Sequence, residues 1–214
     1  MGGLRRLTKY MASKYSPNAL FYGLSALFVM LGMAGSTVSA QKPEVQRLFQ
    51  SGSYEQAVDA ARGGDSASTF LAAQSLLKLD RNDQAAAQFN QLKSSDQPAW
   101  RLVAESGEAM LANDAGRAVQ LARQAVEADG NNAFAQYQLG LAASKASDWG
   151  TAVAAFTKAT ELKPDFAYAH YYAALAHQRM RQLPKSAEHF DAFLRLAPDA
   201  PERAAVIAVL RTIK

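Results

Sequence analysis

Three histidines are the side chains of this 214-residue sequence that come nearest to a chemical site. His170 and His177 are seven residues apart, which is two turns of a helix, so their rings would lie on roughly one face. Paired imidazoles can provide half of a zinc site. No carboxylate stands at ligand spacing between them, and His189 follows further along the chain. We therefore interpret all three as packing or groove histidines and predict no metal.

The sequence contains no other pattern that predicts catalysis. Glu105 and Glu108 would share a helix face, but no apolar neighbours argue for a shifted pKa, so they indicate a solvated surface. There is no Gly-rich phosphate loop, no His-Glu-x-x-His and no Gly-x-Ser-x-Gly. The absence of cysteine excludes disulfides, thiolate metal sites and a cysteine nucleophile. We predict a protein that is not an enzyme and has no cofactor.

The positive charge of the chain is confined to its first 40 residues. The formal net charge is +4, and residues 1–40 carry four basic side chains and no acidic one. Residues 41–214 hold 19 basic and 19 acidic side chains, so the body is neutral and predicts no nucleic-acid binding. The four basic residues of the head are Arg5, Arg6, Lys9 and Lys14.

The same head has the pattern of an export signal. An apolar, uncharged run over residues 19–34 follows the basic residues, and Val38 and Ala40 place small side chains at a signal-peptidase site. Cleavage would leave Gln41 as the new N-terminus. The alternative is an uncleaved membrane anchor, because residues 16–40 could just span about 30 Å of hydrocarbon. Either reading places the rest of the chain outside the cytoplasm, as a periplasmic or secreted protein or one anchored in the inner membrane.

The body of the chain repeats itself with a period of 34 residues. Such an internal match predicts an array of helix hairpins. The matching pairs include Ala133 and Ala167, Tyr137 and Tyr171, Leu141 and Leu175, Phe156 and Phe190, and Pro164 and Pro198.

This repeat resembles the tetratricopeptide repeat (TPR) family in Leu139-Gly140, Ala152, Phe156, Ala159 and Pro164. The resemblance implies an all-α fold, a right-handed superhelical solenoid of antiparallel helix hairpins. Four to five repeats would fill residues 41–199, and a capping helix would fill residues 200–214. The predicted helices cover residues 66–79, 83–93, 98–113, 115–128, 133–146, 149–162, 167–181 and 184–196.

The two ends of the array depart from the family pattern. Residues 45–62 predict a degenerate first repeat, cut short by Gly63-Gly64, with exposed apolar surface through which the protein could self-associate. The third unit offers Gly107 one residue out of step with Gly140. The last helix would turn apolar side chains toward the array and cap its open end. Those side chains are Ala205, Ile207, Val209 and Leu210.

The resemblance also implies a partner-binding groove, because the first helix of each TPR hairpin lines the concave face. It would seat a peptide or protein with apolar anchors and an acidic group near the two cations. Packing between repeats is the alternative for Tyr137 and Tyr171, and Trp100 is a weaker candidate. Gln138 and Tyr172 stand where some members carry carboxylate-clamping asparagines, so that clamp is not implied. The groove residues are Phe134, Tyr137, Leu141, Lys145, Tyr168, Tyr171, Leu175 and Arg179.

The sequence therefore predicts a non-catalytic adaptor or scaffold that is exported and binds a protein or peptide. The alternative is a membrane-anchored accessory subunit that assists export, assembly or secretion at the cell envelope. A hydrolase or transferase module is a third interpretation, against which the missing acid–base groups argue.

Overall fold

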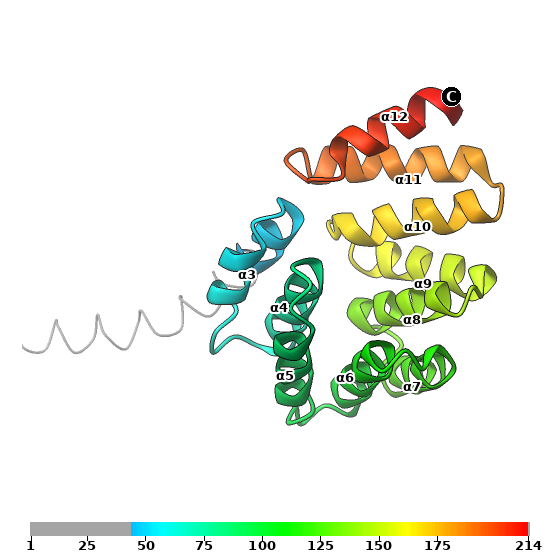
Figure 1. Ribbon diagram of the computed structural model, residues 1–214. Coiled ribbons are helices and arrows are strands. Elements are labelled where there is room, and N and C mark those ends of the chain that lie inside the picture. The colour runs from blue at the N-terminus through cyan, green and yellow to red at the C-terminus, as the bar shows by residue number, and fades with distance from the viewer. Residues whose placement is uncertain (1–43, 214) are drawn as a thin grey trace, which may run out of the picture. The chain divides into compact units, whose positions relative to one another are not determined.

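A computed structural model of the chain describes residues 44–213, which belong to one structural unit, Lys42–Lys214. The predictions for the export signal or anchor fall outside these residues. The described part is built from helices without strands, arranged as successive antiparallel hairpins (Figure 1). None of its helices is long and apolar enough to cross a membrane.

The hairpins confirm the predicted TPR solenoid. A short helix over residues 44–50 pairs with α3 (Tyr54–Ala60) as a reduced first repeat. The last hairpin is followed by a single terminal helix, α12 (Arg203–Ile213). The full hairpins between them are α4 (Ser66–Lys78) with α5 (Asn82–Leu92), α6 (Pro98–Leu111) with α7 (Ala115–Ala128), α8 (Ala133–Lys145) with α9 (Trp149–Leu162), and α10 (Ala167–Arg179) with α11 (Leu183–Leu196).

Each hairpin turns at a residue with left-handed backbone. This conformation lets the amide two positions after the first helix reach back to a carbonyl of its last turn, and the Asp114 amide donates to the Ala109 carbonyl at 2.9 Å. Asp114 then caps the second helix, because its Oδ1 accepts from the Arg117 amide at 3.0 Å. The left-handed residues are Gly52, Asp80, Asn113, Ser147 and Arg181.

Close helix contact inside the hairpins depends on small residues. A Cβ added at Gly140 would lie 2.5 Å from Cε1 of Phe156, so the predicted close approach is confirmed. In the third unit, Gly107 accommodates the ring of Phe89 from the preceding hairpin in the same way, at 2.5 Å from Cζ. Ala122 stands 34 residues before Phe156. Phe89 therefore supplies the bulk that the third unit lacks.

The first repeat packs against the C-terminal half of the chain. Phe49 lies 4.7 Å from the ring of Tyr168, and the hydroxyls of Tyr54 and Tyr168 are 2.9 Å apart. Val45 and Phe49 are completely buried. The expectation that this repeat exposes an apolar surface is therefore wrong, because its apolar face is covered by α10.

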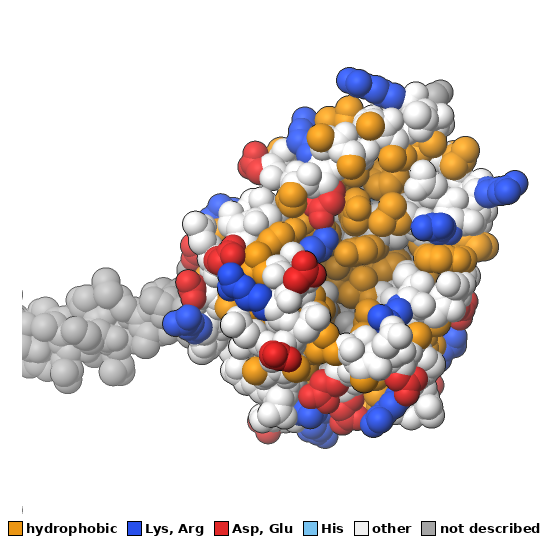
Figure 2. Space-filling model, viewed as in Figure 1, with side chains coloured by type: hydrophobic (Ala, Val, Ile, Leu, Met, Phe, Trp, Pro, Cys, Tyr) orange, Lys and Arg blue, Asp and Glu red, His pale blue; other side chains and the backbone are white. Residues whose placement is uncertain are grey.

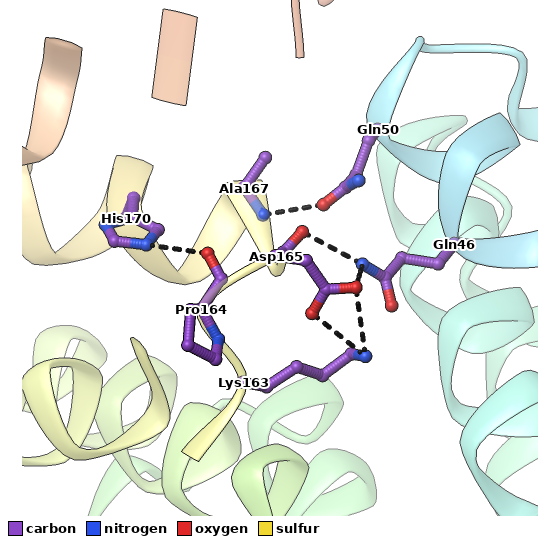
Figure 3. A network of polar contacts seen from close by, with 7 residues as sticks. All are labelled: Gln46, Gln50, Lys163, Pro164, Asp165, Ala167 and His170. Atoms are coloured by element: carbon purple, nitrogen blue, oxygen red, sulfur yellow. Dashed lines mark hydrogen bonds and ion pairs between the residues drawn. The ribbon is translucent and has the colours of Figure 1, made fainter. Parts of the chain in front are cut away.

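Polar contacts reinforce this closure (Figure 3). Gln46 Nε2 donates to the main-chain oxygen of Asp165 at 3.0 Å, and the Ala167 amide donates to Gln50 Oε1 at 2.6 Å. These contacts join residues more than 110 positions apart in sequence and tie the first helix to the turn that precedes α10.

The terminal helix completes the array, with a different inward face from the one predicted. Val206 and Leu210 are buried, whereas Ala205 is exposed. The predicted face is thus wrong at Ala205. Just before the helix, Glu202 accepts from Lys78 Nζ at 2.8 Å, which ties α12 to α4.

Candidate functional site

The concave side of the solenoid is formed by the first helices of the hairpins, since α8 contacts both α6 and α10. The predicted groove residues lie on α8 and α10. Figure 2 shows hydrophobic side chains gathered in a hollow of the viewed face, with Lys and Arg side chains along its edge.

Two of the predicted groove residues are core residues in this structure. Tyr137 is 1% exposed and lies 4.7 Å from the ring of Phe166. Tyr168 is fully buried against Phe49 of the first repeat. Burial raises the pKa of both phenols. With the first repeat in place, neither tyrosine is accessible to a partner.

The other four apolar candidates are partly buried and line the inner side without being sealed. Phe134 packs on Trp100, with ring centroids 5.6 Å apart, and Trp100 itself is buried in the core. Tyr171 packs on Phe193 at 5.1 Å, so part of its ring serves the α10–α11 contact. The partly buried candidates are Phe134, Leu141, Tyr171 and Leu175.

Both cationic candidates are exposed and lie in the last turns of their helices. Lys145 ends α8 and Arg179 ends α10, where a cation also complements the helix dipole. Arg179 lies over the ring of Trp149, 5.4 Å from its centroid. Each cation stands two residues before the left-handed residue of its turn, Ser147 or Arg181.

The same position in α4 is Lys78, two residues before Asp80, and the sequence analysis missed it. Lys78 is partly buried, is paired with Glu202, and lies 4.7 Å from the centroid of Tyr168. Extending the 34-residue and 33-residue alignments back by two repeats would have found it. At this repeat position, therefore, the chain's own carboxylate already binds one cation.

A pocket opens beside Lys145, between the α4–α5 hairpin, α6 and α8. Its volume is about 270 Å³. The predicted residues Leu141 and Lys145 contribute to it, but most of its wall comes from helices that the sequence analysis did not assign to the site. The lining residues are Gln74, Leu77, Asn82, Phe89, Gly107, Met110, Leu111, Gln138, Leu141 and Lys145.

The three histidines meet on the α10–α11 hairpin. His170 Nδ1 lies 3.1 Å from His189 Nδ1, and the rings of His177 and His189 are stacked with centroids 5.4 Å apart. Burial lowers the pKa of His170, and burial together with neighbouring positive charge lowers that of His189 to about 4. In the part of the chain that the structure describes, no three side chains converge as a metal site.

The glutamate pair considered for acid–base chemistry lies on α6. Glu108 forms an ion pair with Lys93 at 2.8 Å, and both side chains are about one-third exposed. This surface ion pair fits the interpretation of a solvated face.

Comparison with known proteins supports the fold. No family model and no curated protein matches the chain. Among solved structures, the first TPR of Spaghetti (RPAP3) bound to an HSP90 peptide is similar, with a TM-score of 0.51, 18% identity, and coverage of 56% of this chain and 92% of that chain. The TPR2AB domain of yeast Sti1 in complex with HSP90 has a TM-score of 0.50 and 15% identity, and the match covers 82% of this chain and 85% of that chain. The described chain has a TPR fold.

Proposed function

We propose that this protein is a non-catalytic interaction module that binds a peptide or protein partner on the concave side of its repeats. One observation carries the proposal. Lys145 and Arg179 are exposed at the edge of an apolar hollow, while Lys78, at the equivalent position of α4, already holds a carboxylate.

The Lys78 contact indicates what the open cations would bind. Its ammonium group meets Glu202 at 2.8 Å and also faces the ring of Tyr168, so a carboxylate beside an aromatic group is the chemistry that this repeat position takes. Lys145 stands beside apolar Leu141, and Arg179 stands beside Trp149. The partner segment therefore carries an acidic group next to apolar anchors.

Charge reversal of the open cations tests this proposal. Lys145→Glu with Arg179→Glu should abolish capture of the partner from native-cell extract after mild cross-linking, with mass spectrometry as the readout. The two side chains are exposed, so the melting temperature should change little. Arg117→Glu with Lys158→Glu makes the same charge change on exposed positions of the second helices and serves as the matched control.

A partner is assigned to the groove only when the native protein and the control retain it and the double variant loses it. Equal retention by the groove variant would contradict the proposal.

Export from the cytoplasm is the second part of the proposal, and the basic head, the apolar run over residues 19–34 and the small residues before Gln41 support it. The intact mass and N-terminal sequence of the protein from its native cells decide between its two forms. A chain that begins at Gln41 in a soluble exported fraction supports a free adaptor. A chain that keeps residues 1–40 in the membrane fraction supports the anchored accessory subunit. A full-length chain in the cytoplasm contradicts both.

A further inference from the structure

The pocket beside Lys145 contains a buried polar atom without a partner. Gln138 is completely buried and lines the pocket, and its Oε1 accepts no hydrogen bond from any residue that the structure describes. A buried carbonyl oxygen in this situation loses the hydrogen bonds that water gives it in the unfolded chain. The rest of the Gln138 amide is fully engaged, so the unpartnered oxygen is a local property of this site.

The orientation of that amide is fixed by Ser106. The Ser106 hydroxyl donates to the Ala118 carbonyl at 2.9 Å, so its oxygen is free to accept. Gln138 Nε2 donates to this oxygen at 3.1 Å and to Met110 Sδ at 3.3 Å. The reversed amide would place Oε1 against two acceptors. Both N–H groups are therefore used, and the pocket offers an acceptor but no donor from this side chain.

The remaining wall of the pocket is mainly apolar. Leu77, Phe89, Met110 and Leu111 surround the space of about 270 Å³, and the ammonium group of Lys145 lies at its exposed edge. A matching ligand has an apolar body, one donor and no buried acceptor, and a π-face for the cation. The indole of tryptophan has all of these, since its Nε1–H only donates.

We propose that this pocket takes a tryptophan side chain of the partner, with the indole N–H donating to Gln138 Oε1. The inference rests on the proposed function, because it specifies the anchor of the segment that the groove binds. The chain cannot supply the indole itself. Its two tryptophans are Trp100, buried in the core, and Trp149, which lies against Arg179. A carboxylate does not fit this position, because two acceptors would face each other.

The test uses the full chain labelled with ¹³C-methyl methionine and three small probes. These are N-acetyl-tryptophanamide, its 1-methylindole analogue and N-acetyl-phenylalaninamide. The tryptophan probe should shift the Met110 methyl signal and leave that of Met180 unchanged, because Met180 is exposed outside the pocket. The 1-methyl analogue and the phenylalanine probe should each bind about ten-fold more weakly, because neither donates the hydrogen bond.

A variant separates the hydrogen bond from simple fit. Gln138→Met replaces the amide with an apolar side chain of similar length, so the tryptophan probe and its 1-methyl analogue should then bind equally. Gln136→Met on the same helix, outside the pocket, should keep the ten-fold difference. Circular dichroism checks that both variants fold, and the comparison of probes on the native protein needs no variant.

Three results would overturn the inference. They are equal affinities of the indole and its 1-methyl analogue for the native chain, a difference that survives in Gln138→Met, and no shift of Met110 with any probe. The proposed function fails separately. If Met110 does not respond but Lys145→Glu with Arg179→Glu still abolishes partner capture, only the tryptophan anchor is wrong.

Discussion

Acid should destabilise this protein through the histidines of the α10–α11 hairpin. The Pro164 carbonyl lies 3.2 Å from His170 Nε2 and only accepts, so Nε2 carries the proton. His170 Nδ1 is then the acceptor and His189 Nδ1 the donor in the 3.1 Å contact between the rings. A second proton on His170 would set two N–H groups against each other. The folded hairpin therefore favours the neutral rings.

The size of the effect follows from His189, whose pKa is lowered to about 4 by burial and by the positive charge of His170, His177 and Lys185. The unfolded chain, with a histidine pKa of about 6.5, binds the proton first, so stability is complete above about pH 6.5 and falls as the pH drops toward 4. Between pH 7.5 and pH 5 the full shift removes about 2 kcal/mol from the free energy of unfolding. Partial exposure of the ring and solvent screening reduce this to about 1 kcal/mol.

Urea unfolding at pH 7.5 and pH 5, followed by circular dichroism, measures this loss. The chain has only these three histidines, and most carboxylates stay ionised above pH 5, so few other side chains titrate in this window. His189→Gln keeps a polar side chain that does not titrate and should reduce the loss by about 1 kcal/mol. If the variant loses as much stability as the native chain between the two pH values, the assignment to His189 is wrong.

Two further predictions concern packing and closure. Gly140→Ala should lower the free energy of unfolding by about 1–2 kcal/mol, because the new Cβ meets the Phe156 ring. Gly116→Ala, where a Cβ would meet nothing closer than 3.8 Å, should raise it by about 0.5–1 kcal/mol, and urea titration of both variants checks the opposite signs. Tyr168→Phe should lower it by about 1–3 kcal/mol, because the hydroxyl donates to Glu202 Oε2 at 2.8 Å. An unchanged melting temperature of Tyr168→Phe would show that this contact contributes little to closure.

The hairpins could be predicted from the sequence because their determinants are local and repeated. Small residues at Gly140 and Ala152, and a residue able to hold left-handed backbone in each turn, act within one hairpin. The 34-residue period then shows the same signals again in the next hairpin. The predicted helix boundaries agree with the structure to within about two residues for this reason.

The site was less predictable because it depends on contacts between distant repeats. The repeat pattern assigns Tyr137 and Tyr168 to the concave face, but it does not show that Phe70 and Phe49 cover them. Those contacts join residues 67 and 119 positions apart in sequence. The pocket was missed for a similar reason, since its walls come from three repeats. Gln138 was assigned only by its place in the family pattern, and its unpartnered oxygen depends on Ser106 one repeat earlier.

Closure by the first repeat also limits the kind of partner that the groove can accept. A long helix lying along the whole concave side would need Tyr168 and Lys78, which Phe49 and Glu202 already occupy. Displacing them would cost the buried contacts of the first repeat and leave Lys78 without its carboxylate. A short segment that places an anchor in the pocket and an acidic group at Lys145 pays no such cost. The geometry therefore favours short linear segments over long helices.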